Sequence, residues 1–142
     1  MQVSGLLAGK GSDVVTVAPD TPVGSVAAQL AQHRIGAVVV SGDGSAIDGI
    51  VSERDIVRAL ADQGASALEQ PASAIMTSEV FTCEPRTTVE ELMGLMTEHR
   101  IRHIPVVIDG KLTAIVSIGD IVKHRIDELQ DERDQLVGYI QQ

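Results

Sequence analysis

The chain has 142 residues, which allows one compact domain or two very small halves with a shared core and excludes most multidomain enzymes. Hydrophobic residues make up 44% of it, but Trp is absent and Phe81 and Tyr139 are the only aromatic residues. The core must therefore be mainly aliphatic. Twenty acidic residues against 11 Lys and Arg give a net charge of −9, which opposes binding to the phosphates of nucleic acid.

The N-terminal segment lacks the cationic start and long apolar stretch of a signal peptide. No apolar run approaches the ~20 residues that a membrane helix needs. Cys83 is the single cysteine, so the sequence offers neither an internal disulfide nor a thiolate metal cluster. We therefore expect a cytoplasmic protein without a membrane partner.

Apolar spacing and turn residues predict a β-α-β-β-α order in the first half. The predicted elements are a β-run over 14–17, a helix from Thr21 to near His33 with Pro22 at its first helical position, β-runs over 37–40 and 47–52 around the turn Gly42-Asp43-Gly44, and a helix over 53–62. Short helical turns are predicted over 4–7 and 73–76, the second at the end of a Gly-, Ser- and Ala-containing linker.

The second half predicts the same order. Its elements are a β-run over 80–83, a helix from a Thr87/Glu90 capping box to near His99, β-runs over 104–108 and 112–117, and a helix from about Ile118. Asp109-Gly110 between two apolar runs is a strong hairpin signal. Pro105 cannot donate to a ladder, so it predicts an edge strand or a bulge.

The last helix is longer than its counterpart and carries a heptad-like apolar stripe. The stripe consists of Ile126, Leu129, Leu136 and Ile140, with Arg133 interrupting it and acidic residues on the other side. Two readings stay open, because two heptads can either pack against the chain's own domain or form a dimer contact.

The two halves are an internal repeat. At an offset of 66, nine of the 27 positions over 14–40 are identical to those over 80–106, and at an offset of 65, six of the eight over 50–57 are identical to those over 115–122. Two copies are too few for a solenoid, which normally needs at least three. We therefore expect an α/β fold in which the copies pack as a closed pseudo-two-fold pair.

The repeat resembles a tandem pair of CBS (cystathionine-β-synthase) domains, over about 3–125. The resemblance rests on Gly49-Ile50-Val51-Ser52-Glu53-Arg54-Asp55, which recurs as Ala114-Ile115-Val116-Ser117-Ile118-Gly119-Asp120, and on the segment from Glu98 to Val107. Ala114 departs from the family's signature glycine, and Val39 stands where the second copy has Pro105. The predicted division is a first CBS repeat over 1–62, a linker over 63–73, a second repeat over 74–125 and a C-terminal helix over 126–142.

The resemblance implies a stand-alone CBS-domain pair of bacterial type, commonly a homodimer, that acts as a regulatory module and not as an enzyme. Its usual ligands contain adenosine: AMP, ADP, ATP, NAD or S-adenosylmethionine. No required cofactor and no metal site are expected. One alternative is an interaction module with unoccupied clefts, whose acidic last helix holds an unknown protein target. A nucleotide hydrolase is a further alternative, but the sequence offers no group that would activate water.

By the same resemblance, each ligand cleft draws on both copies. The first cleft would use Thr16, Ile35, Gly36 and Ala37 with Ile115, Ser117 and Asp120. The second would use Thr82, Ile101, Arg102, His103 and Pro105 with Ile50, Ser52, Arg54 and Asp55.

The residue types in these clefts suit a nucleotide. An ionised carboxylate can accept from both hydroxyls of a ribose, and a phosphate binds to N–H groups at a helix N-terminus and to cations. Since Gly36 corresponds to Arg102, the second cleft is predicted to favour the more highly phosphorylated ligand. Ser-x-x-Asp before an apolar helix is also a capping box, which we expect in the empty site.

Overall fold

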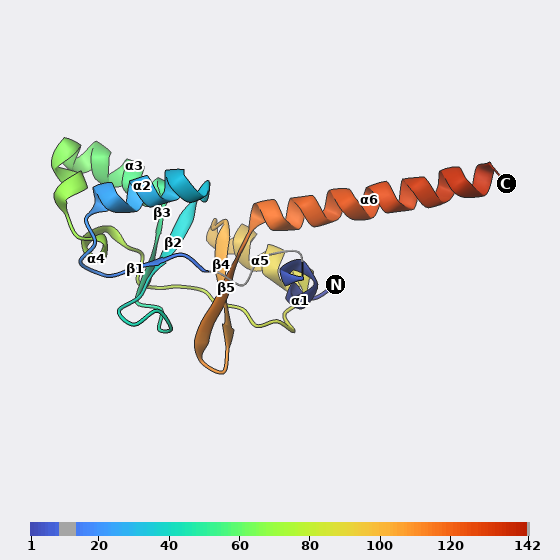
Figure 1. The fold of residues 1–142 in the computed structure, drawn as a ribbon, viewed down its shortest axis with the longest axis horizontal. Coiled ribbons are helices and arrows are strands. Elements are labelled where there is room, and N and C mark those ends of the chain that lie inside the picture. Colours follow the sequence, from blue (N-terminus) through green and yellow to red (C-terminus); the bar gives the residue numbers. More distant parts are fainter. Residues whose placement is uncertain (9–13, 142) are drawn as a thin grey trace.

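The computed structural model describes residues 1–8 and 14–141 (Figure 1). In chain order the elements are α1 (Val3–Leu7), β1 (Thr16–Val17), α2 (Val23–His33), β2 (Ala37–Val40), β3 (Gly49–Ser52), α3 (Glu53–Gln63), the 3-10 helix η1 (Gly64–Glu69), α4 (Ala72–Ile75), α5 (Val89–His99), β4 (His103–Ile108), β5 (Lys111–Ser117) and α6 (Ile118–Ile140). The mixed α/β fold and the repeated helix-strand-strand-helix order are confirmed.

Each half has its own small sheet. In the first half β2 is central, parallel to β1 and antiparallel to β3. In the second half β4 and β5 form an antiparallel hairpin. The predicted β-run over 80–83 is wrong in length, because only Cys83 pairs with β4, through a parallel bridge to Val106. The Cys83 N–H donates to the Pro105 carbonyl and the Cys83 carbonyl accepts from the Val107 N–H, so this one residue makes both hydrogen bonds of the bridge.

The predicted turn signals hold in the second hairpin. Asp109 and Gly110 have φ angles of 51° and 75°, the pair of positive values that a tight type I′ turn requires. The register of β4 and β5 shifts between Val106 and Val107, directly after Pro105. The prediction of a bulge or edge at this proline is therefore confirmed, since a residue without an N–H cannot continue a regular ladder on both sides.

The predicted starts of α2 and α5 are each displaced by one residue, whereas α3 and α6 begin at Glu53 and Ile118 as predicted. Thr88, not Thr87, caps α5, and its hydroxyl accepts from the Glu91 N–H. The Thr87 hydroxyl instead accepts from the Glu84 N–H in the preceding turn. In α2 the N-cap is Pro22 and the helix begins at Val23. The predicted ends are confirmed: both helices finish at a histidine, followed by an arginine in the left-handed conformation.

The buried residues form two separate clusters, one around each sheet. The first is built mainly by α2, β2, β3 and α3, and the second by α5, β4, β5 and the start of α6. Both are aliphatic, as the composition requires. Met93 of α5 does not belong to the second cluster, and nearly half of its surface is exposed.

The short helices cross between the halves. Val3 and Leu6 of α1 belong to the second cluster, and Ala72 of α4 belongs to the first. Equivalent hydrogen bonds hold both helices: the Val3 N–H donates to the Thr87 carbonyl and the Ala72 N–H donates to the Thr21 carbonyl, at 2.8 and 2.7 Å, and Thr21 and Thr87 are equivalent positions of the repeat. This matched exchange ties the repeats together as a pseudo-two-fold pair.

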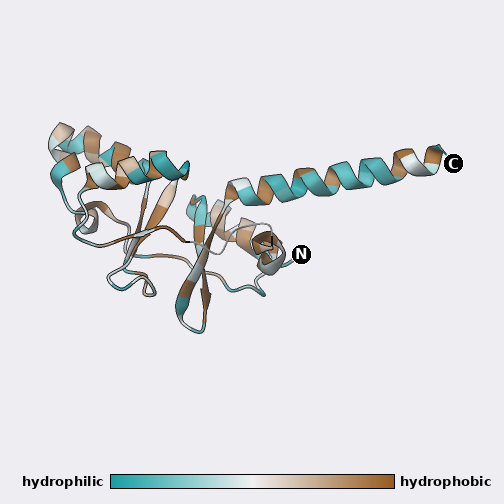
Figure 2. Cartoon of the chain, in the orientation of Figure 1, coloured by the Kyte–Doolittle hydropathy of each residue, from teal (hydrophilic) through white to brown (hydrophobic). Residues whose placement is uncertain are grey.

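Helix α6 projects far beyond the rest of the molecule (Figure 1), and apolar residues lie at intervals along it (Figure 2). Its one buried residue in the described chain is Ile121, near its start. Of the two open readings of the stripe, packing on the chain's own domain is wrong, because Ile126, Leu129, Leu136 and Ile140 are all exposed. None of the helices in the described ranges is both long and apolar enough to span a membrane.

Candidate functional site

The signature carboxylate of the first repeat lies at the start of α3, where β3 turns into a helix. The Ser52 N–H and hydroxyl both donate to Oδ2 of Asp55, at 2.8 and 3.0 Å, and the Asp55 N–H donates back to the Ser52 hydroxyl. This is the predicted capping box, and it fixes the orientation of the carboxylate in the field of the helix N-terminus.

The other oxygen of Asp55 faces a residue from beyond the linker. The Thr77 hydroxyl donates to Oδ1 of Asp55 at 3.4 Å, and Thr77 exchanges two backbone hydrogen bonds with Ile50. The chain therefore returns from the linker to pair beside the end of β3. Sequence reasoning did not find Thr77, because only this crossing brings it to the carboxylate and no local motif marks it.

The second repeat reproduces the same capping arrangement. The Ser117 N–H and hydroxyl donate to Oδ2 of Asp120 at 2.8 and 3.1 Å, and the Asp120 N–H donates to the Ser117 hydroxyl. The two carboxylates therefore stand at equivalent helix N-termini, α3 and α6. Each is held by its own serine in a fixed rotamer.

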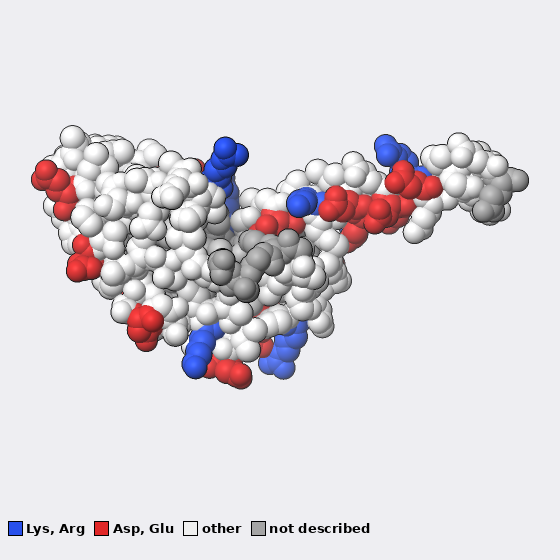
Figure 3. All heavy atoms as spheres, viewed as in Figure 1, with Lys and Arg blue, Asp and Glu red and all other residues white. Residues whose placement is uncertain are grey.

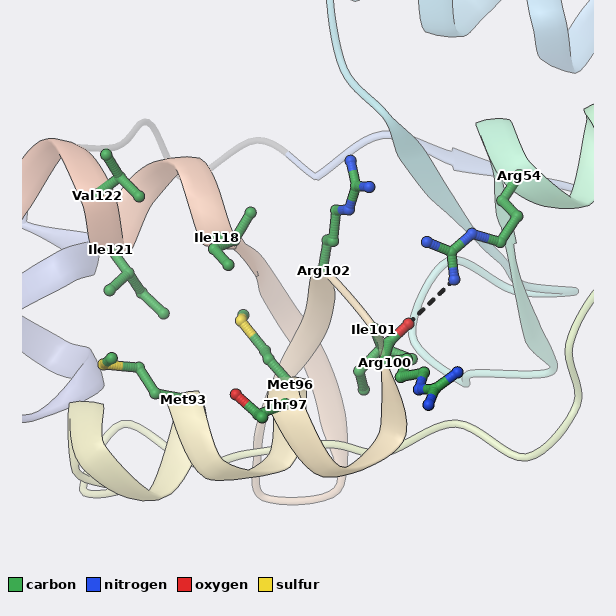
Figure 4. Close-up of a pocket in the computed structure, with 10 residues that line it drawn as sticks. All are labelled: Arg54, Met93, Met96, Thr97, Arg100, Ile101, Arg102, Ile118, Ile121 and Val122. Atoms are coloured by element: carbon green, nitrogen blue, oxygen red, sulfur yellow. Dashed lines mark hydrogen bonds between the residues drawn. The ribbon is translucent and has the colours of Figure 1, made fainter.

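A hollow of about 400 Å³ opens between α5 and the start of α6 (Figure 4). We call it the Arg54 hollow, and its lining residues are Arg54, Met93, Met96, Thr97, Arg100, Ile101, Arg102, Ile118, Ile121 and Val122. Arg54 reaches it from α3 of the first repeat, and its Nη1 donates to the Arg100 carbonyl at 3.2 Å. Among residues 1–8 and 14–141, the lining thus contains three guanidinium groups and no carboxylate.

A second hollow, of about 460 Å³, lies between α2 and α3. We call it the Glu53 hollow, and its lining residues are Ala27, Leu30, Ala31, Arg34, Ile35, Gly36, Glu53, Ile56 and Val57. Every one of these has its repeat counterpart in the Arg54 hollow. The charges differ, because the Glu53 hollow has one guanidinium and one carboxylate. The pseudo-symmetry therefore places an apolar hollow in each repeat but a cationic rim in only one.

Two residues from different predicted clefts meet where the repeats join. A Cβ on Gly36 would lie 3.1 Å from Cε1 of His103 and 3.7 Å from a carboxylate oxygen of Glu53. The Gly36 carbonyl accepts from the Glu53 N–H, and the equivalent Arg102 carbonyl accepts from the Ile118 N–H. Because Gly36 has no side chain, the His103 ring can pack against its backbone.

The family is decided by comparison with known proteins. The CBS domain model matches residues 11–62 and 72–127. The chain belongs to the CBS-domain family. It is 48% identical to the CBS-domain containing protein ATU1752 from Agrobacterium tumefaciens, whose crystal structure superimposes with a TM-score of 0.84 over 87% of this chain and 92% of that one.

Two further relatives are informative for this CBS pair. The CBS domain protein PAE2072 from Pyrobaculum aerophilum, solved in complex with AMP, is 32% identical, with a TM-score of 0.75 over 84% of this chain and 89% of that one. The mitochondrial CBS domain-containing protein CBSX3 of Arabidopsis thaliana is 40% identical over 126 residues, which is 86% of this chain. The match spans 61% of that relative's length.

The structure brings together some of the predicted CBS ligand residues and separates others. Ile50, Ser52 and Asp55 lie together, whereas Arg54, Ile101 and Arg102 line the Arg54 hollow. Ile35 and Gly36 line the Glu53 hollow, and Ser117 with Asp120 forms the cap of α6. On the strands, Thr16 pairs with Val39, Ala37 with Ser52, and Pro105 with Ile115, while Thr82 is exposed next to Cys83. Neither hollow is lined by a signature Ser or Asp.

The signature glycine of the first CBS repeat has a steric cause. A Cβ on Gly49 would lie 2.5 Å from Sδ of Met76 and 2.9 Å from the Thr77 carbonyl oxygen. Because the segment carrying Thr77 passes this close to β3, the position excludes any larger residue. No group of three or more potential metal-ligating side chains occurs within residues 1–8 and 14–141.

Proposed function

We propose that this CBS pair is a non-catalytic regulatory module that binds an adenosine-containing nucleotide, AMP, ADP, ATP or NAD, in clefts between its repeats. The observation that carries the proposal is the arrangement of Asp55, with Oδ2 held by Ser52 and Oδ1 turned toward Thr77. The AMP complex of PAE2072, a relative of the same fold and size class, supports an adenosine ligand.

The Asp55 carboxylate suits the two neighbouring hydroxyls of a ribose. Its capping bonds hold the group in place without a ligand, so little rotamer entropy would be lost on binding. The 3.4 Å contact from Thr77 is long for a hydrogen bond between oxygens, so a ribose hydroxyl can replace it at small cost. Asp120 would serve the other cleft in the same way, with Ser117 as its support.

The phosphate end would be held on the side of the Arg54 hollow. Arg54 and Arg102 both line it, and no carboxylate does so in the part of the chain that the structure describes. The Glu53 hollow offers one cation beside one anion. This difference supports our expectation that the cleft with Asp55 prefers the more phosphorylated ligand, because charge-assisted hydrogen bonds to phosphate are the strong ones.

Regulation by such a module requires that the ligand distinguish two states of the protein. We propose that the module works as a homodimer whose arrangement responds to the nucleotide. A second function, holding a protein target on α6, is favoured by the exposed stripe of that helix. S-adenosylmethionine is the alternative small ligand, and it would use the same ribose contacts.

Calorimetric titration with AMP, ATP, NAD, S-adenosylmethionine and GTP tests the proposal. Asp55→Asn and Asp120→Asn keep the size of the side chain while removing the charge that two ribose hydroxyls would share. Asp62→Asn, exposed at the other end of α3, is the matched control. We expect each site variant to lose one binding event and the control to lose none. Unchanged binding in both site variants, or no binding of any adenosine compound, would sink the proposal.

A further inference from the structure

The projecting part of α6 carries a largely apolar seam that the described residues of the chain leave exposed. The seam consists of Val122, Ile126, Leu129, Arg133, Leu136 and Ile140, which alternate in steps of four and three residues. Such spacing is the heptad pattern of a helix that pairs with another helix. The apolar members of the seam are between 50% and 78% exposed. On a helix about 35 Å long, an apolar face of this kind extends too far to pack against the chain's own core.

Charges are sorted along the same helix. Lys123 and Arg125 lie near the base of its projecting part, after Asp120 of the capping box. Five acidic residues lie over 127–134 with Arg133 among them, and the segment 135–141 has no charge. Figure 3 shows the acidic side chains gathered on the middle of the projecting helix. A basic base and an acidic middle are complementary to each other only if a second such helix runs in the opposite direction.

We propose that α6 pairs antiparallel with α6 of a second copy of this chain. In the register that fits the charges, Ile126 packs against Leu129 of the partner subunit and Arg125 lies beside Glu132 of the partner subunit. The two-fold symmetry repeats both contacts. This inference deepens the proposed function, because it names the surface through which two copies of the module meet.

A parallel pair fits the sequence less well. It would place Arg133 against Arg133 of the partner subunit in the centre of the seam, with two like charges desolvated together. The antiparallel register separates them, since each Arg133 then lies opposite Val122 of the partner subunit. The long arginine stem can cover that apolar layer while its charged end reaches water.

The same register extends the contact onto the body of the module. Residues 135–137 of one copy would lie opposite residues 118–120 of the other, at the start of α6, where Ile118 lines the Arg54 hollow and is about half exposed. Met93, the exposed methionine of α5, borders that hollow. The uncharged end of the helix is therefore the part that would cover an apolar rim, close to the cations proposed to hold phosphate.

Sedimentation velocity of the full chain without nucleotide tests the seam. Leu129→Lys should weaken dimerisation at least about tenfold, because the seam would then bury an unpaired charge. Asp131→Asn changes the net charge by the same amount on the outer face of the helix and should leave dimerisation unchanged. A chain that is monomeric throughout the micromolar range, or a Leu129→Lys variant that dimerises as tightly as the parent, would overturn the proposal.

Charge reversal tests the direction of pairing. Arg125→Glu and Glu132→Arg should each weaken the dimer, and the double reversal should restore it. Within one helix these residues are two turns apart, about 10 Å along the axis, so restoration has to come from contact between copies. As a second readout, tagged Ile126→Cys should form a disulfide with untagged Leu129→Cys. Efficient disulfides between two Leu129→Cys chains, or no restoration, would exclude the antiparallel pair.

Nucleotide titration of Leu129→Lys separates this inference from the binding proposal. We expect that variant to bind nucleotide with the parent's stoichiometry, since Asp55 and Asp120 lie outside the seam. Loss of dimerisation with retained binding supports the seam. Retained dimerisation of this variant would refute pairing through the seam without contradicting the proposal that the module binds nucleotide.

Discussion

Nη1 of Arg54 donates a hydrogen bond of 3.2 Å to the backbone carbonyl of Arg100 and so joins α3 of the first CBS repeat to the residue that caps α5 in the second. The contact crosses 46 residues of chain. Through this contact the Arg54 guanidinium of the first repeat lines the Arg54 hollow of the second repeat. Arg54, whose counterpart is Gly119, therefore adds to the asymmetry of the two hollows that Arg102 and Glu53 also create.

Arg54→Ala should weaken ATP binding about tenfold, the value of one charge-assisted hydrogen bond, while AMP loses less. The reason is that the lost cation would act on the outer phosphates. Calorimetry with both nucleotides measures the ratio. Arg58→Ala, one turn further along α3 and exposed, is the matched control and should alter neither affinity. An equal loss for AMP and ATP would contradict the assigned role.

Gly49→Ala should lower the free energy of unfolding by about 1–3 kcal/mol, the usual cost of overpacking. The new methyl group would meet the Thr77 carbonyl at 2.9 Å, and a backbone atom cannot move aside easily. Urea denaturation followed by circular dichroism measures the change. Gly94→Ala, in the middle of α5 with nothing within 4 Å, should instead gain about 0.5–1 kcal/mol. Equal effects of the two substitutions would disprove the steric explanation.

Arg34→Gly should stabilise the protein by about 0.5–1 kcal/mol. Arg34 follows α2 with φ at 54°, in the left-handed region that glycine adopts without steric cost. Gln32→Gly, two residues earlier inside the helix and exposed, should destabilise the protein by about 1 kcal/mol. The opposite signs of the two changes would separate relief of backbone strain from the greater entropy of an unfolded chain that contains glycine. Thermal unfolding of both variants tests this, and a loss of stability on Arg34→Gly would count against it.

Cys83 should resist alkylation in the folded protein. Burial, with a smaller contribution from Glu84, raises the pKa of its thiol to about 11, so the reactive thiolate is scarce near neutral pH. The unfolded chain loses this proton at a lower pH than the folded chain. Cys83 therefore contributes stability below that pH, and the contribution is lost as the pH rises toward 11. Iodoacetamide at pH 8 should label the chain rapidly in urea and slowly without it. Comparable rates in both conditions would refute the assignment.

The sequence predicted elements best where the signal is local. Ser52 with Asp55, and Asp109 with Gly110, adopt the predicted cap and turn because three or four residues contain all the partners involved. The start of α5 was misplaced because Thr87 and Thr88 both precede a glutamate at the right spacing. Which threonine caps the helix depends on the turn at Glu84, because the Glu84 N–H donates to the Thr87 hydroxyl and leaves Thr88 as the cap.

Helical spacing also predicted a buried face without saying what covers it. In α5 it holds for Leu92 and Met96, while Met93 at the margin of that face stays exposed. In α6 the spacing of Ile126 and Leu129 is equally regular, but the helix leaves the body and neither residue is buried. Periodicity indicates that one face of a helix is apolar, but the direction of the helix determines which neighbour that face contacts.

The sequence by itself determined that the chain holds two CBS repeats, where their helices end, and which carboxylates stand at helix N-termini. The tertiary structure decided that α1 packs with the second repeat and α4 with the first, that Thr77 reaches Asp55, and that His103 fills the space Gly36 leaves. The physical reason is that the two repeats present nearly identical local signals. Only the path of the chain through space determines which of two equivalent partners each residue meets.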